Sequence, residues 1–132
     1  MKFTVLGTSE FTLCCLKALL NAGQEICSIF SMPKSISPNN SVDITSFAKQ
    51  NKIIYYEVKD INSSKTLRLL SKHSPDYILV SWPKILKKEV LKIPKYFCIG
   101  THPTALPFNR GRHPLQWIIA LGVKKNKLSF FK

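Results

Sequence analysis

The chain of 132 residues is long enough for one domain with one hydrophobic core and too short for two. Its hydrophobic fraction of 45% and charged fraction of 20% are ordinary for a globular protein, and no apolar run approaches the roughly 18 residues that cross a bilayer. The first residues lack the charged and apolar regions of a signal peptide, so we expect a cytoplasmic protein with no membrane partner.

The net charge of +13 favours anionic partners such as nucleic acid or phosphorylated small molecules. All seven acids lie at or before Glu89, whereas residues 90–132 carry eight basic residues and no acid. Two interpretations remain open: a surface that binds nucleic acid, or lysines scattered one at a time as a compositional habit of the source genome.

The four cysteines lie in apolar runs and form no C-x-x-C pair: Cys14, Cys15, Cys27 and Cys98. We expect reduced thiols packed in the core, because a zinc site needs paired spacing on exposed loops. We therefore expect no metal site.

The first thirty residues predict one βαβ unit. Residues 2–6 form a strand, Ser9 caps a helix that carries Glu10 in its first turn and ends near residue 21, and residues 25–30 form the second strand. The single Gly7 in the turn is far from a G-x-G-x-x-G fingerprint, so a nicotinamide cofactor gains little support.

The rest of the chain continues the alternation. After a mobile Ser- and Pro-rich loop at 31–41, the pattern predicts helices at 42–51, 64–72, 85–91 and 115–121, and strands at 53–56, 76–80, 96–99 and 127–131. His73 follows a helix and has no function assigned. Short connections between alternating elements predict an α/β fold with a Rossmann-like, doubly wound, mostly parallel sheet.

Residues 98–114 are rich in residues that shape loops or carry chemistry, more than a simple connection between two elements needs. They include three prolines, two glycines, two histidines and two arginines. Proline fixes φ, so this is a stiff loop. It presents the imidazole of His102 directly after a strand, where open α/β sheets place their chemistry.

The motif His-Pro-Thr-x-Leu-Pro-x-x-Arg-Gly-Arg-His-Pro, from His102 to Pro114, resembles the active-site loop of the folate-dependent formyltransferases. Residues 1–10 and 82–91 extend the likeness over nearly the whole chain. The resemblance implies transfer of a formyl group from N10-formyltetrahydrofolate to the amine of methionyl-tRNA, glycinamide ribonucleotide or a nucleotide-linked amino sugar. The second Arg-His is unusual in the tRNA branch, so the motif looks more like the sugar N-formyltransferases that act on dTDP- or UDP-amino sugars.

Formyl transfer needs a donor aimed at the developing oxyanion and a group that handles the amine proton. The family uses an Asn-x-His pair and a more distant Asp, and His102 matches the histidine. Gly100 stands where the family has Asn, and loss of one oxyanion donor typically costs about 10²–10³ in rate. A backbone N–H, or the hydroxyl of Thr101 or Thr104, is the available substitute.

The resemblance also implies binding residues. Trp82 is either a packing anchor or an apolar wall for the pterin ring, in a cofactor-binding group that comprises Ser81, Trp82, Pro83, Lys84, Leu106 and Pro107. The two arginines are either solvated charges or contacts for a diphosphate or folate glutamate, in a substrate-binding group that comprises Gly7, Thr8, Ser9, Thr104, Arg110, Gly111 and Arg112. His113 is expected to be structural.

The family's Asp lies beyond the strand expected at 127–131. We therefore expect residues 1–132 to be an incomplete catalytic domain whose sheet is truncated at its C-terminal edge. Activity of this chain alone is doubtful. A truncated sheet exposes an edge strand, which favours a homodimer. Three functions stay open: a sugar N-formyltransferase, a methionyl-tRNA formyltransferase for which tRNA is the nucleic-acid partner, and an inactive remnant or binding module of the same fold.

Overall fold

The computed structural model describes residues 1–111 and 113–132, in two compact units. The N-terminal unit is Met1–Cys98 and the C-terminal unit is Ile99–Lys132. Each unit is described by itself below, with β5 beginning in the first unit and ending in the second.

The strands follow the order β3-β2-β1-β4-β5-β6. β1 pairs in parallel with β2 and with β4, β2 pairs in parallel with β3, and β5 pairs with β6 in the antiparallel sense. The predicted mostly parallel α/β sheet is confirmed. Its strands are β1 (Lys2–Gly7), β2 (Glu25–Ser31), β3 (Tyr55–Glu57), β4 (Tyr77–Ser81), β5 (Phe97–His102) and β6 (Ser129–Phe131).

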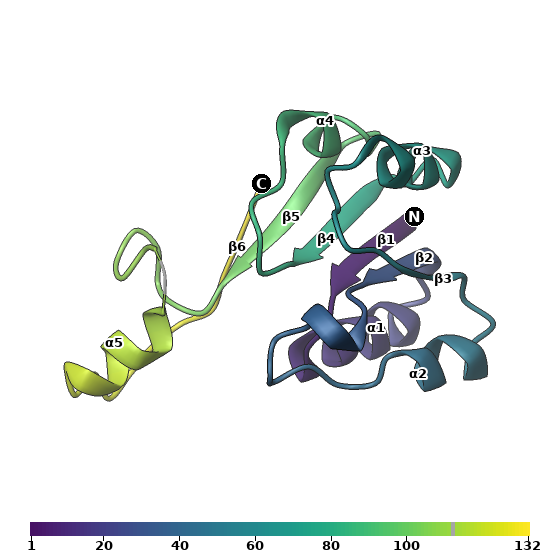
Figure 1. Cartoon of the computed structure of the whole chain (residues 1–132). Coiled ribbons are helices and arrows are strands. Elements are labelled where there is room, and N and C mark those ends of the chain that lie inside the picture. The colour runs from purple at the N-terminus through teal and green to yellow at the C-terminus, as the bar shows by residue number, and fades with distance from the viewer. Residues whose placement is uncertain (112) are drawn as a thin grey trace. The chain divides into compact units, whose positions relative to one another are not determined.

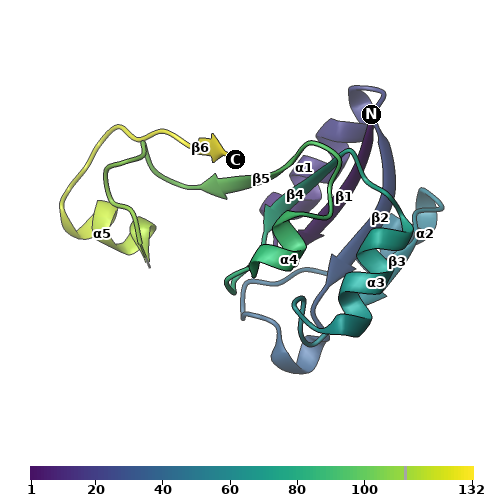
Figure 2. The same cartoon turned by 90° about the horizontal axis from the view of Figure 1, so that it is seen from above.

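Helices cover both faces of the sheet in the N-terminal unit. In Figures 1 and 2, α1 and α2 lie on one face while α3 and α4 lie on the other. The chain changes face after β3, so the order reverses between β1 and β4, which makes this the topological switch point of the sheet. The helices are α1 (Glu10–Asn21), the 3₁₀ turn η1 (Lys34–Ile36), α2 (Thr45–Gln50), α3 (Ser64–Lys72), α4 (Lys88–Leu91) and α5 (Pro114–Ala120).

The turn from β1 into α1 is fixed by a reciprocal cap. The Ser9 hydroxyl accepts from the Thr12 amide at 3.4 Å, and the Thr12 hydroxyl accepts from the Ser9 amide at 3.3 Å. A Cβ on Gly7 would lie 2.2 Å from Thr12 Oγ1, so glycine is what lets the helix start this close to the strand.

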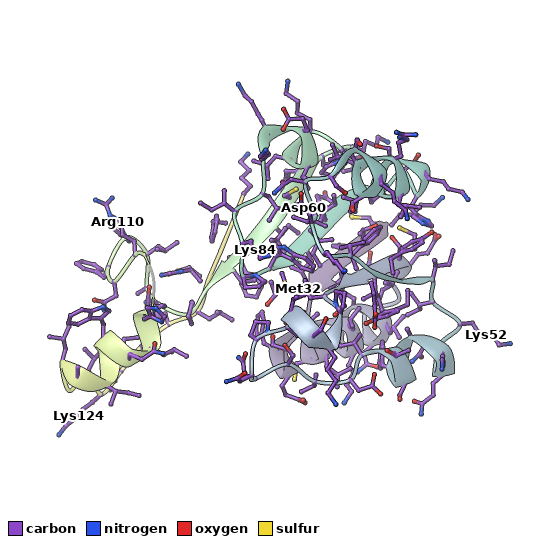
Figure 3. All side chains as sticks on the ribbon, in the orientation of Figure 1. Met32, Lys52, Asp60, Lys84, Arg110 and Lys124 are labelled. Carbon is purple, nitrogen blue, oxygen red and sulfur yellow. The ribbon has the colours of Figure 1, made fainter. Side chains whose placement is uncertain are left out.

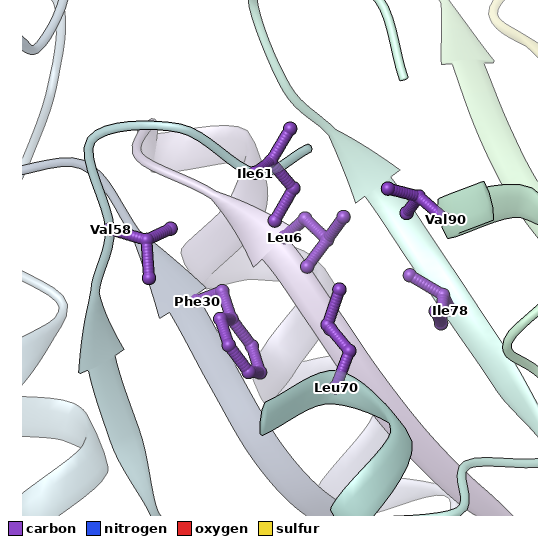
Figure 4. Packing of buried hydrophobic residues seen from close by; sticks show 7 residues of the cluster. All are labelled: Leu6, Phe30, Val58, Ile61, Leu70, Ile78 and Val90. Atoms are coloured by element: carbon purple, nitrogen blue, oxygen red, sulfur yellow. The ribbon is translucent and has the colours of Figure 1, made fainter. Parts of the chain in front are cut away.

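One hydrophobic core cluster of the N-terminal unit lies on the α3 and α4 side of the sheet (Figure 4). Side chains from β1, β2 and β4 meet those of α3 and α4 and of the segment after β3, and none is more than 8% exposed. This cluster packs the three strands against that helical layer. Its members are Leu6, Phe30, Val58, Ile61, Leu70, Ile78 and Val90.

Several element bounds differ from the sequence expectation. The helix expected at 85–91 is confined to α4, because the Asn62 side chain accepts from the Lys87 amide at 2.7 Å and donates to the Ile85 carbonyl at 3.1 Å. α2 starts at Thr45 rather than at residue 42, because the Asp43 carboxylate accepts from the Thr45 amide at 2.8 Å.

Two further segments show detail beyond the sequence expectation. β3 begins two residues late, because the Ile53 amide donates to the Ala48 carbonyl and so closes α2. The loop expected to be mobile at 31–41 contains η1, where Ser37 donates its hydroxyl to the carbonyls of Met32 and Pro33.

The cysteines are free, as expected, but not all are packed in the core. Cys14 is exposed, while Cys15, Cys27 and Cys98 are half-buried. The prediction of a buried Cys14 is wrong because α1 turns that side chain away from the sheet. Burial raises the pKa of the Cys98 thiol to about 11.

Within the described residues, the helices are all too short or too polar to cross a membrane.

Candidate functional site

Two of the predicted site segments meet at one edge of the N-terminal unit. β1 and β4 are neighbours in the sheet, and Gly7 lies opposite Ser81 in the register. The turn residues Thr8 and Ser9 and the segment that follows Ser81 therefore leave the sheet side by side at the switch point. Ligands of open α/β sheets bind in this position.

Trp82 follows β4 and packs against the core cluster, so it serves as a packing anchor. Its indole Nε1 is buried and, among the described residues, has no hydrogen-bond partner. A buried N–H without a partner costs about 1–3 kcal/mol. Pro83 and Lys84 are exposed, and Lys84 is labelled in Figure 3.

In the C-terminal unit, β5 continues beyond residue 99, where the strand was expected to end. Gly100, Thr101 and His102 are strand residues and pair with β6. Residue 100 lies opposite Phe131, whose ring would be 2.5 Å from a Cβ at this position. The ring therefore occupies the space that an asparagine side chain would need at residue 100.

The imidazole of His102 is anchored by the loop that follows it. Its Nε2 lies 3.0 Å from the carbonyl oxygen of Asn109. A carbonyl only accepts, so Nε2 carries the hydrogen, and this partner assigns the tautomer. In the neutral imidazole the lone pair is then on Nδ1, for which the described residues provide no partner.

The loop after His102 is held by side chains. Thr104 is 1% exposed and donates its hydroxyl to the Phe108 carbonyl at 2.8 Å. Ser129 donates its hydroxyl to the Thr104 carbonyl at 2.7 Å and accepts from the Leu106 amide at 3.1 Å. Asn126 donates to the Pro103 carbonyl at 2.7 Å. The hydroxyl of Thr104, predicted to contact substrate, thus supports the loop.

Ser129 and Asn126 were missed at the sequence level. Each lies more than 20 residues from the residue whose carbonyl it bonds, and each is one of many polar residues in a lysine-rich stretch. No periodic pattern or motif marks them.

Four further predicted residues follow in the same loop: Leu106, Pro107, Arg110 and Gly111. Arg110 is exposed, and it projects from the loop in Figure 3. Leu106 and Pro107 are also exposed, while Gly111 has a positive φ of 107°. Arg112 lies outside the described residues. His113, at φ 57°, precedes α5 as its N-cap residue.

The structure thus gathers the predicted residues into two groups, each within one unit. Gly7, Thr8 and Ser9 join Ser81–Trp82–Pro83–Lys84 at the switch point of the N-terminal unit. In the C-terminal unit, His102 ends β5, and Thr104 and Arg110 belong to the loop that follows it.

Comparison with known proteins places both groups in one family. The profile of the family named Formyl transferase matches residues 1–129. A methionyl-tRNA formyltransferase of Alkaliphilus oremlandii is 31% identical over 98% of this chain, and one of Clostridium perfringens is 36% identical over 94%. The chain spans about two fifths of the length of these relatives, 43% and 42% respectively.

Solved structures show the same fold at low identity. A phosphoribosylglycinamide formyltransferase of Bacillus halodurans superimposes with a TM-score of 0.77 at 13% identity, over 98% of this chain and 70% of that one. A formyltetrahydrofolate deformylase of Pseudomonas syringae gives 0.74 at 19% identity, over 98% of this chain and 44% of that one. With a family match that covers almost every residue and relatives above 30% identity, the chain belongs to the formyl transferase family.

Proposed function

We propose that this chain is the N-terminal part of the catalytic domain, spanning residues 1–132, of an enzyme that transfers a formyl group from N10-formyltetrahydrofolate to a primary amine. The observation that carries the proposal is the imidazole of His102, held at the end of β5 by the Asn109 carbonyl with Nδ1 left unpaired among the described residues. Family membership supplies the reaction class.

In the proposed reaction the amine nitrogen attacks the formyl carbon and a tetrahedral oxyanion develops. His102 accepts the amine proton at Nδ1, the carbon–N10 bond breaks, and N10 takes up a proton to leave tetrahydrofolate. A general base in this position typically contributes about 10²–10⁴ in rate. Because Gly100 has no side chain, the proposed oxyanion donors are backbone N–H groups and the Thr101 hydroxyl.

The proposed donor site is the segment after β4. The half-buried ring of Trp82 suits apolar contact with a flat ring. Ser81, Pro83 and Lys84 complete this proposed folate-binding group within the N-terminal unit. The likeness to a formyltetrahydrofolate deformylase, which shows the fold alone, is in keeping with this assignment.

Methionyl-tRNA is the acceptor that the comparisons support. The relatives at 31–36% identity are methionyl-tRNA formyltransferases, and eight basic residues without an acid in 90–132 suit a phosphate backbone. Binding to tRNA would then weaken steeply as the salt concentration rises.

A nucleotide-linked amino sugar is the second candidate acceptor. It is favoured by the sequence Arg110-Gly111-Arg112-His113-Pro114, which resembles the sugar N-formyltransferases. Guanidinium groups pair bidentately with phosphates, so the two arginines suit a diphosphate.

The test is a formyl-transfer assay on the natural gene product, with methionyl-tRNA and with dTDP- and UDP-amino sugars as alternative acceptors. We expect turnover of one class, with His102→Ala lowering kcat by about 10²–10⁴. His113→Asn is the matched control, since asparagine tolerates the positive φ at that position. Turnover of neither class would show instead a binding module or remnant of this fold. Full activity in His102→Ala would show that His102 is not the proton acceptor.

A further inference from the structure

The two helical layers of the N-terminal unit differ strongly in charge. Residues 64–72 and 85–95, which include α3 and α4, carry seven bases and one acid. Residues 10–21 and 43–52, which include α1 and α2 and are of nearly equal length, carry three bases and two acids. The positive charge of the unit is therefore concentrated on the α3 and α4 side of the sheet.

The seven bases are all exposed, on the side of the helices that is turned away from the core. In α3, the three bases recur at helical spacing, opposite the buried Thr66 and Leu70. In residues 85–95, Leu86, Val90 and Ile93 belong to the core cluster or pack against it, which leaves the lysines outside. We call this surface the basic layer, and its bases are Lys65, Arg68, Lys72, Lys87, Lys88, Lys92 and Lys95.

The two halves of the basic layer lie side by side. Figures 1 and 2 both show α3 next to α4 on the same face of the sheet. The Asn62 side chain, just before α3, accepts from the Lys87 amide at 2.7 Å and donates to the Ile85 carbonyl at 3.1 Å. The turn that leads into α4 is thereby fixed beside the start of α3, so the bases of both segments form one surface.

Two aliphatic side chains project from the same surface. Ile85 is 88% exposed and Leu91 is 48% exposed. Single exposed apolar residues are ordinary on protein surfaces, but Ile85 lies on a turn whose backbone is held at two points by Asn62. The basic layer therefore presents an apolar side chain from a fixed position, surrounded in sequence by lysines.

The combination of exposed bases and aliphatic side chains favours an anionic lipid surface over RNA. Nucleic-acid surfaces that bind single strands pair bases with phosphates and stack aromatic rings on the nucleobases, and residues 64–72 and 85–95 contain no aromatic residue. Lysines near an anionic membrane surface each contribute attraction, and aliphatic side chains gain by leaving water for the acyl region.

We propose that the basic layer binds the surface of an anionic lipid bilayer, with Ile85 inserted at the acyl boundary and the lysines against the headgroup phosphates. Such binding is peripheral and needs no spanning helix, and it departs from the expectation of no membrane partner. The proposal does not rest on the proposed formyl transfer, because the residues of the basic layer lie outside the residues assigned to that reaction.

The test is co-sedimentation of the chain with vesicles of phosphatidylcholine alone and of phosphatidylcholine with about 30% phosphatidylglycerol. We expect binding to the anionic vesicles alone, and a steep loss of binding between about 0.05 M and about 0.5 M NaCl. A short single-stranded RNA is the second probe, used with the same variants.

The triple variant Lys87→Gln/Lys88→Gln/Lys92→Gln should lower the partition constant for anionic vesicles at least about 10-fold. The matched control is Lys17→Gln/Lys49→Gln/Lys52→Gln, which removes three exposed lysines from the opposite side of the sheet and should change binding less than about 2-fold. Ile85→Ser should lower binding about 5- to 20-fold, and it should leave RNA binding unchanged.

Equal loss of vesicle binding in the two triple variants would show attraction by net charge alone and would overturn the proposal. Unchanged binding in the triple variant of the basic layer would place the vesicle contact elsewhere in the chain, with the same consequence. A greater loss for RNA than for vesicles in that variant, or full vesicle binding in Ile85→Ser, would assign the surface to nucleic acid instead. These readouts are independent of turnover, so failure here leaves the proposed formyl transfer untouched, and the reverse also holds.

Discussion

His102 shows how one backbone carbonyl sets the chemistry of a side chain. Asn109 has a positive φ of 51°, which turns its carbonyl back toward the imidazole. Asparagine is among the residues that accept this conformation most readily. The tautomer of His102 therefore depends on the backbone of a turn seven residues away. The side chain of Asn109 takes no part in this hydrogen bond.

We predict that neutral His102 carries its proton on Nε2. Long-range ¹H–¹⁵N spectra of the imidazole distinguish the two tautomers directly. Asn109→Gly keeps the positive φ accessible and should preserve the Nε2–H form, whereas Asn109→Val disfavours that φ and should give mixed tautomers. An Nδ1–H form in the parent chain would contradict the geometry and remove the proposed proton acceptor.

At this scale, the sequence motif identified His102 but not its partner. A hydrogen bond to a backbone oxygen leaves no residue-type signal, so Asn109 could be found only once the turn was seen. The same holds for Gly100, whose neighbour Phe131 is set by the β5–β6 register rather than by any local pattern.

Among the elements, the β1–α1 turn was predictable because its signals are local. Ser9 and Glu10 mark a helix start, and Ala22–Gly23 marks its end. The length of α4 was overestimated because the side chain of Asn62 bonds the backbone just before the helix. Asn62 lies 25 residues before its partner Lys87. Local patterns therefore predicted the presence of the elements, while side chains distant in sequence set some of their bounds.

We predict that Gly7→Ala lowers the free energy of unfolding by about 1–3 kcal/mol or more, the typical cost of overpacking. The added Cβ would meet Thr12, which is fully buried and tied into the helix cap. Urea unfolding followed by far-ultraviolet circular dichroism measures the loss.

Gly100→Ala is the matched control for that experiment. Its Cβ would meet the tip of the Phe131 ring, which is 47% exposed and can rotate away. It should therefore cost less than Gly7→Ala, by about 1 kcal/mol or more. Equal losses of unfolding free energy in the two variants would show that the close contact between β1 and α1 does not cause the destabilisation of Gly7→Ala.

For the whole molecule, the two units differ in how far the sequence could predict them. The N-terminal unit has buried strands and amphipathic helices, whose apolar patterns indicate the fold directly. In the C-terminal unit, α5 exposes Leu115, Trp117 and Ile119. The hydrophobic pattern predicted a helix in this segment, but it does not indicate which residues these side chains pack against.

The unequal surroundings of the four cysteines give the molecule a built-in labelling position. Three of the thiols are less reactive. Cys98 has a pKa of about 11, so a fraction of about 10⁻⁴ is thiolate at pH 7. Burial raises the pKa of Cys15, and the Cys27 thiol donates a hydrogen bond to the Phe3 carbonyl. Cys14 is exposed on α1. A maleimide dye at neutral pH should therefore attach at Cys14 first, which peptide mapping would verify and Cys14→Ser would abolish. The N-terminal unit can thus carry a fluorophore without any engineered residue.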